Sequence, residues 1–296
     1  MRAQYPDFEG HVERDGVQLG YEVFGSGDRT ILLLPTWTII HSRFWKMQVP
    51  YLSRHFRVIT YDGPGNGRSD RVTDPERYTP AAYAEDAVAV LAECGAASAV
   101  VVGLSLGAAY GSMLASGFPD RVAALVMVGP SIPLTPPSPE RSIIESNFMA
   151  PLSKEAKGWE RYNIAYWHHD YRGFTEFFFS QCFNERHSTK AIEDSVGWAD
   201  GADAEILEAE ALAPSVSVDA WKRVLGDIQC PVLVIHGTED RISPVGRGIA
   251  AARLTDGELV AMEGSGHIPN VRDPVRVNRI LKDFIDRIAD KESVAL

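Results

Sequence analysis

The stretch VVGLSLGAA, residues 101–109, decides the fold class of this 296-residue chain. It starts as an apolar strand, passes through a G-x-S-x-G turn and continues in an alanine-rich pattern typical of a helix. This arrangement holds a serine in a strained, exposed position, and the flanking glycines avoid collisions with neighbouring backbone. The stretch therefore predicts Ser105 as a nucleophile. The alternative is a small residue that only packs tightly at a turn.

Two further candidate catalytic residues follow Ser105 in the sequence, each in the loop after a predicted strand. Pro231–His236 is a continuous apolar run suited to a buried parallel strand, and Asp240 lies in the loop behind it. Glu258–Met262 is another predicted strand, and its exit loop carries His267. Active sites of open parallel sheets lie outside the carboxyl ends of the strands. We therefore expect Ser105, Asp240 and His267 to meet at one edge of the sheet.

The rest of the chain alternates between strand and helix patterns, which predicts an α/β protein with a mostly parallel sheet flanked by helices. The predicted strands are Val12–Arg14, Val17–Phe24, Thr30–Leu34, Arg57–Tyr61 and Val122–Val128, the first two forming a hairpin. The predicted helices include the segment His41–Arg54, helical as far as Pro50, and Pro80–Cys94.

The alternation stops after residue 129. A proline-rich stretch is followed by helical patches dense in aromatic residues, and the sheet pattern resumes only at Cys230. Residues 1–129 and 228–296 are therefore predicted to form one core, with 130–227 as a helical insertion. The acidic residues of this insertion are interpreted as a solvated helix face; they are Asp200, Asp203, Glu205, Glu208 and Glu210.

The composition of the chain excludes some classes of binding partner. A net charge of −11 without a basic cluster argues against nucleic acid and anionic membranes. No apolar run suits a signal peptide or a membrane span. Cys94, Cys182 and Cys230 lack metal-ligand spacing and are interpreted as buried thiols of a reducing compartment. We expect a cytoplasmic monomer or homodimer that uses no metal and no cofactor.

Four motifs together resemble the α/β-hydrolase superfamily over nearly the whole chain. They are YDGPGNGRS at 61–69, GLSLG at 103–107, HGTED at 236–240 and GSGH at 264–267. The order and spacing of the four are specific, although each one alone is common. The resemblance implies an α/β-hydrolase fold in which the insertion 130–227 forms a helical cap over the active site.

The expected chemistry is nucleophilic. A serine hydroxyl needs a base within hydrogen-bond reach, and the imidazole of His267 can take up and return a proton near neutral pH. Asp240 is expected to orient that imidazole. Glu239 is the neighbouring alternative, but Asp240 matches the acid position of the family's HGxxD pattern. His236, before a tight glycine turn, is interpreted as structural.

The tetrahedral intermediate needs an oxyanion hole. One donor is expected to be the backbone N–H of Leu106. The second should come from the loop after the strand that ends at Leu34, where the family usually has His-Gly and this chain has Pro35-Thr36-Trp37. The register favours Trp37, with Thr36 as the alternative. Further candidates for lining the pocket are Thr36, His41, Trp159, Tyr166 and Trp167, and the candidate carboxylate-binding arginines of the cap are Arg141, Arg161, Arg172 and Arg186.

The sequence thus predicts a serine hydrolase of a small carboxylic ester, lactone or thioester, acting through an acyl-enzyme on Ser105. One alternative is a hydrolase of carbon–carbon bonds in vinylogous diketones from aromatic ring cleavage. The other is a non-catalytic ligand receptor on the same scaffold. In each case the expected partner is a small molecule.

Overall fold

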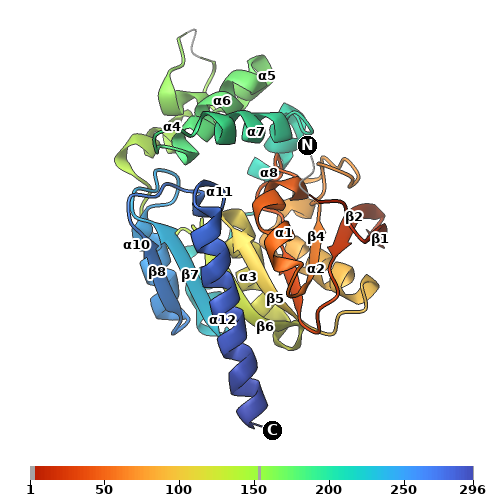
Figure 1. The fold of residues 1–296 in the computed structure, drawn as a ribbon. Coiled ribbons are helices and arrows are strands. Elements are labelled where there is room, and N and C mark those ends of the chain that lie inside the picture. The colour runs from red at the N-terminus through yellow and green to blue at the C-terminus, as the bar shows by residue number, and fades with distance from the viewer. Residues whose placement is uncertain (1–3, 153–154, 296) are drawn as a thin grey trace.

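A single eight-stranded sheet forms the centre of the molecule (Figure 1). The computed structural model describes residues 4–152 and 155–295. The strand order is β1-β2-β4-β3-β5-β6-β7-β8, and only β2 runs antiparallel to its neighbours β1 and β4. The bounds are β1 Phe8–Arg14, β2 Val17–Phe24, β3 Thr30–Leu33, β4 Arg57–Tyr61, β5 Ala99–Leu104, β6 Val122–Val128, β7 Val232–Gly237 and β8 Glu258–Met262. The predicted α/β class with a mostly parallel sheet is confirmed.

The central strands are buried along their whole length because helices cover both faces of the sheet. Every residue of β5 and β7 is buried, and both are continuous runs of mainly branched apolar side chains, as expected for parallel strands. On one side, α3 (Leu106–Gly117) contacts α2 (Pro80–Glu93) and α9 (Val218–Gly226), and α9 contacts α10 (Val245–Leu254). On the other, α1 (Val49–Leu52) contacts α12 (Pro274–Ala295), which crosses the front of the sheet in Figure 1.

Two elements near the N-terminus differ from the sequence prediction. The first strand begins at Phe8, four residues earlier than predicted, because its polar residues pair with β2 at an exposed edge. The predicted helix His41–Arg54 is instead a 3-10 helix, Ser42–Met47, followed by α1. Pro50 is tolerated there because the first turn of a helix does not need its N–H.

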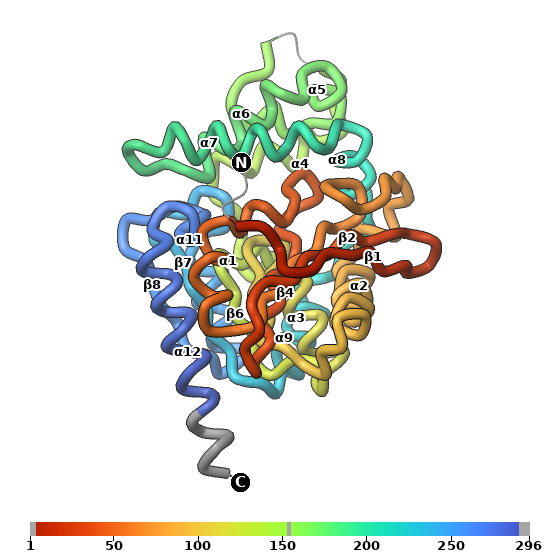
Figure 2. Tube along the Cα trace, turned by 45° about the vertical axis from the view of Figure 1, so that its right-hand side comes forward, coloured from red at the N-terminus to blue at the C-terminus, as the bar shows by residue number. Residues whose placement is uncertain are grey.

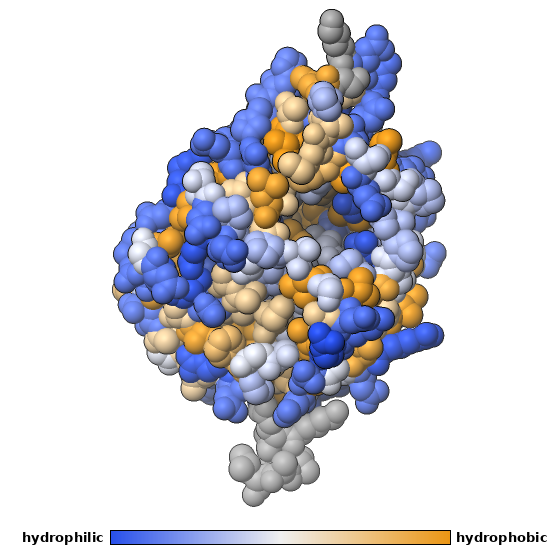
Figure 3. Space-filling model, turned by 180° about the vertical axis from the view of Figure 1, so that it is seen from behind, coloured by the Kyte–Doolittle hydropathy of each residue, from blue (hydrophilic) through white to orange (hydrophobic). Residues whose placement is uncertain are grey.

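The insertion after β6 consists of short helices and connecting loops, with no strand among the residues that the structure describes. After a 3-10 turn at Pro139–Arg141 come α4 Ile143–Asn147, a second turn at Gly158–Arg161, α5 Ile164–His169, α6 Tyr171–Cys182, α7 Thr189–Ala199 and α8 Ala204–Ala211. Figures 1 and 2 both place α4–α8 over one end of the sheet. Figure 3 shows a hollow with apolar residues around it beneath this upper segment. The last helix of the predicted insertion, α9, packs against α3 and α10 beside the sheet.

Candidate active site

The turn between β5 and α3 holds Ser105 in a strained conformation. Its φ of +57° lies in the left-handed region, which non-glycine residues rarely adopt. A Cβ atom at Gly103 would lie 2.1 Å from the carbonyl oxygen of Gly107, and one at Gly107 would lie 2.4 Å from that of Pro35. Both positions therefore require glycine, and the sharp strand–turn–helix geometry forms as predicted.

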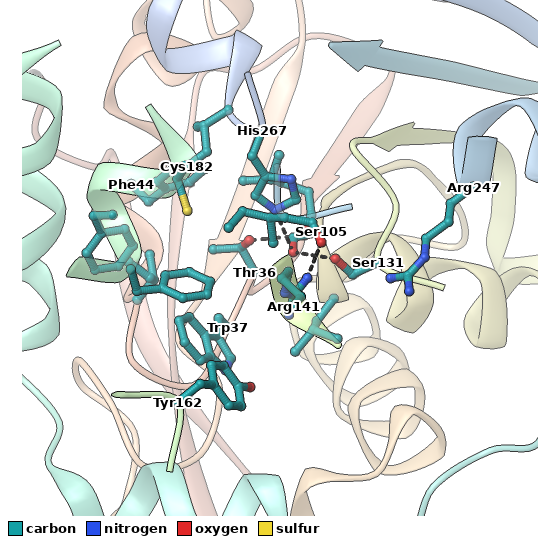
Figure 4. Close-up of a pocket in the computed structure, with 17 residues that line it drawn as sticks. Thr36, Trp37, Phe44, Ser105, Ser131, Arg141, Tyr162, Cys182, Arg247 and His267 are labelled. Carbon is teal, nitrogen blue, oxygen red and sulfur yellow. Dashed lines mark hydrogen bonds between the residues drawn. The ribbon is translucent and has the colours of Figure 1, made fainter. Parts of the chain in front are cut away.

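A chain of hydrogen bonds joins Ser105 to the loops after β7 and β8. Ser105 Oγ lies 2.9 Å from His267 Nε2 (Figure 4), and His267 Nδ1 lies 2.7 Å from Asp240 Oδ2. A carboxylate can only accept, so Nδ1 carries the hydrogen and Nε2 accepts from the serine hydroxyl. The structure thus brings the three predicted residues together. The carboxylate facing His267 belongs to Asp240 and not to Glu239.

Asp240 is buried and accepts hydrogen bonds at both oxygens. Oδ1 accepts from the backbone N–H groups of Ile242 and Ser243 at 2.8 and 2.9 Å. Burial alone would raise the pKa of Asp240, but the charges of His267 and His236, with their hydrogen bonds, outweigh it and hold this pKa well below its usual range. Asp240 therefore stays ionised and fixes the ring of His267.

His236 is a second histidine on the same carboxylate. Its Nε2 lies 3.1 Å from Asp240 Oδ2 and 2.8 Å from the carbonyl oxygen of Ser243. A carbonyl only accepts, so Nε2 carries the hydrogen and shares it between the two oxygens. The sequence interpretation of His236 as structural missed this contact with Asp240.

Ser131 touches the candidate nucleophile and was not predicted as a site residue. The hydroxyl oxygens of Ser131 and Ser105 lie 3.0 Å apart. Since the single hydrogen of the Ser105 hydroxyl points to His267, Ser131 donates to Ser105. Its position just after β6, the strand beside β5, is the sequence signal that could have identified it.

Ser105 and His267 lie at the wall of a cavity of about 180 Å³ between the sheet and the insertion. Thr36, a predicted lining residue, and Trp37 line it from the loop after β3. The insertion contributes both polar and apolar wall, namely Arg141, Tyr162, Phe178, Phe179 and Cys182 (Figure 4).

Four of the predicted lining residues lie outside this cavity. His41 caps the 3-10 helix and its ring meets that of Trp198. Trp159 packs edge-on against Phe177. Tyr166 lines a separate pocket of the insertion, and Trp167 is fully buried. The prediction was wrong for these residues because their rings hold the insertion together or join it to the core.

One acidic residue of the insertion is not solvated, contrary to the prediction. Glu210, on α8, points its carboxyl into the contact with the core, where Oε1 accepts from the Tyr110 hydroxyl at 3.3 Å and Oε2 is buried without a hydrogen bond. Burial raises the pKa of Glu210 to about 8, and hydrogen bonding by Trp37 and Tyr110 opposes that rise only in part. By contrast, Glu208 pairs with His168 at the surface.

The two residues that the sequence predicts as oxyanion-hole donors, Leu106 and Trp37, both line the cavity. Leu106 is the first residue of α3, and the first N–H groups of a helix have no acceptor within it. Trp37 follows β3 and lines the cavity beside Leu106 and Ser105. The side chain of Thr36 donates to the carbonyl oxygen of Leu104 at 3.0 Å, which ties this loop to the end of β5.

Within the described residues, no group of three or more His, Cys, Asp or Glu side chains is placed to hold a metal ion. Cys94, Cys182 and Cys230 are free thiols; only Cys182 is fully buried, and the other two are partly exposed. Among the described helices, none combines the length and apolar character needed to cross a membrane.

Comparison with known proteins gives one family. A family model described as "alpha/beta hydrolase fold" matches residues 29–274. The "Putative carbamate hydrolase RutD" of Caulobacter vibrioides is 41% identical over 112 residues, which cover 37% of this chain and only 41% of that protein. The "3-oxoadipate enol-lactonase 2" of Acinetobacter baylyi is 23% identical over 95% of this chain and 97% of its own. Among solved structures, a thermophilic esterase from Thermogutta terrifontis superimposes with a TM-score of 0.75 at 24% identity, covering 95% of this chain and 99% of the esterase.

Proposed function

Because the chain belongs to the α/β-hydrolase fold family, we propose that it is a serine hydrolase of small carboxylic esters, lactones or thioesters. The observation that carries the proposal is the hydrogen-bonded chain from Ser105 through His267 to Asp240 at the wall of a cavity. Relatives named as a lactonase and an esterase support the class of bond.

The proposed reaction has two halves. Ser105 Oγ attacks the substrate carbonyl while its proton passes to His267 Nε2, and the imidazolium then gives that proton to the departing alcohol or thiol. Water next attacks the acyl-enzyme and gives a proton to His267, which returns it to Ser105 Oγ as the bond to the acyl group breaks and the free acid leaves. The ionised Asp240 stabilises the imidazolium in both halves.

The negative charge of each tetrahedral intermediate needs donors. We assign this role to the backbone N–H groups of Leu106 and Trp37, with Thr36 as the alternative for the second. Contact between the two loops is close, because Gly107 packs against the carbonyl of Pro35. Backbone donors do not depend on side-chain identity, so the missing His-Gly pair does not remove the hole.

The size of the cavity limits the substrate. An apolar cavity of about 150 Å³ holds one benzene molecule, and the cavity beside Ser105 measures about 180 Å³. The insertion, which we propose acts as the cap, supplies much of the wall. We therefore propose short or medium acyl groups as substrates, and we infer that long lipids are excluded.

A substrate panel tests this function. It contains p-nitrophenyl esters from acetate to palmitate, a lactone, and a diketone product of aromatic ring cleavage. The proposal predicts highest kcat/KM for short or medium esters and none with Ser105→Ala. Cleavage of the diketone in preference to every ester would favour the carbon–carbon hydrolase instead. Ligand binding without turnover of any substrate would favour the receptor.

A further inference from the structure

Two arginines line the cavity beside Ser105, and they come from opposite sides of it; Arg247 is buried and Arg141 is half-buried. Arg141 ends the 3-10 turn Pro139–Arg141 of the insertion, whereas Arg247 lies in the first turn of α10 in the core. Figure 4 shows both guanidinium groups on the same side of the site as Ser131. Only Arg141 was among the arginines that the sequence singled out.

Neither guanidinium has an acidic partner. Within the described part of the chain, no ion pair involves Arg141 or Arg247. Arg141 donates to the carbonyl oxygen of Ile242 and lies over the ring of Trp159, 4.9 Å from its centroid. Arg247 donates through Nε to the carbonyl oxygen of Thr135 at 3.2 Å. These acceptors carry no net charge, and the Nε of Arg141 is buried without any hydrogen bond.

The two arginines also repel each other. Burial lowers the pKa of both, and the charge of Arg141 lowers the pKa of Arg247 further, to about 10. Both keep their charge at neutral pH, because a guanidinium group is not deprotonated there. Asp240 is the acidic residue that acts on both, but its oxygens are already taken by His267, His236 and two backbone N–H groups.

Removing a cation from water without a counter-ion costs free energy, and two such cations beside one small cavity cost more because they also repel each other. An anion bound between them would relieve both the desolvation and the repulsion. Arginine suits this role because its planar fork of N–H donors matches a carboxylate.

We propose that Arg141 and Arg247 form an anion subsite, so that the preferred substrate is an ester or lactone that also carries a carboxylate. This proposal rests on the serine hydrolase function and names its substrate class. The reacting carbonyl lies at Ser105, and the free carboxylate lies between the two guanidinium groups.

The test compares esters that differ only in charge. Monoethyl succinate, glutarate and adipate are paired with ethyl 4-methylpentanoate, 5-methylhexanoate and 6-methylheptanoate, in which an isopropyl group replaces the carboxylate at the same length. Ethanol release gives kcat/KM for each. The proposal predicts that the best charged ester exceeds its neutral partner at least tenfold.

Variants assign the preference to the two side chains. Arg141→Met and Arg247→Met should each lower the charged-to-neutral ratio about tenfold to a hundredfold, the range for hydrogen bonds to a charged group. The matched control is Arg172→Met, because Arg172 lies on the exposed face of α6, paired with Glu176 and Asp200. The charged-to-neutral ratio of Arg172→Met should equal that of the wild type.

The outcomes separate the two proposals. If the neutral esters are hydrolysed and no charged ester is preferred, the anion subsite is wrong and the hydrolase stands. That wild-type comparison needs no variant, so a variant that fails to fold leaves it decisive. If no ester is hydrolysed, the hydrolase is wrong, and titration calorimetry with adipate then decides on the subsite alone. Binding that both Met variants weaken supports it, and no binding overturns it.

Discussion

The buried carboxyl of Glu210 makes the free energy of unfolding depend on pH, and the variant Glu210→Gln should remove that dependence. At neutral pH the group is mostly protonated, because burial raises its pKa to about 8. The Tyr110 hydroxyl on α3 donates to it, Trp37 on the loop after β3 also lowers its pKa, and the other titratable groups near it are Tyr78, Tyr83, Tyr162 and Tyr171. No cation pairs with Glu210 within the ranges that the structure describes. The variant Glu210→Gln is shaped like the neutral acid and cannot ionise.

The size of this pH dependence follows from the pKa of Glu210 in the unfolded chain and in the folded protein. An acid whose pKa is raised in the folded protein stabilises the fold least at high pH, because the unfolded chain loses the proton first. The loss of stability begins near the ordinary value of 4.5 and is complete near 8. At about 1.4 kcal/mol per pH unit, this interval corresponds to a ceiling of about 5 kcal/mol.

Urea unfolding of both proteins at several pH values from 5 to 9 measures this difference. Near pH 5 the two free energies of unfolding should agree to within about 1 kcal/mol. With each step up to pH 8, the free energy of unfolding of Glu210→Gln should rise relative to that of the wild type. Glu205→Gln, at an exposed position on the same helix, serves as the control and should show no such trend. A constant difference between Glu210→Gln and the wild type at every pH would refute the reasoning.

Three further predictions concern turnover. Asp240→Asn should keep the fold and lower kcat/KM about 10⁴-fold, because the amide mis-sets the His267 tautomer; a larger loss from Glu239→Gln would show the acid to be misassigned. Assays of kcat/KM against pH should show activity lost in acid, because a protonated base cannot accept the proton of Ser105, and rates that stay flat down to about pH 4 would exclude a histidine base. For neutral p-nitrophenyl esters, each buried methylene should improve kcat/KM by about 1 kcal/mol until the cavity is full. A maximum at palmitate would instead indicate a lipase lid.

The sheet could be predicted from the sequence because its central strands are buried on both faces. Such strands are continuous apolar runs, and the predicted bounds of Arg57–Tyr61 and Val122–Val128 are those observed, while Thr30–Leu34 and Pro231–His236 differ by at most one residue at each end. The convergence of Ser105, Asp240 and His267 followed from the same pattern. Loops after parallel strands share one edge of the sheet, so their side chains meet there.

The rest of the site depends on how the insertion packs on the core, which no local pattern encodes. Arg247 reaches the cavity from a helix of the core, and Glu210 turns inward from a helix with several acidic residues. Trp167, in contrast, was expected at the cavity and lies inside the insertion. An aromatic or charged residue on an amphipathic helix looks the same in sequence whether it faces a cavity, a neighbouring helix or solvent.

The central claim is that Ser105 is the nucleophile, and active-site labelling tests it most directly. A fluorophosphonate probe reacts with an activated serine, so the wild-type protein should take up one label per chain at Ser105. Ser105→Ala should take up none and should lose about six orders of magnitude in turnover. Full labelling of Ser105→Ala would contradict the account, because the reactive group would then lie elsewhere.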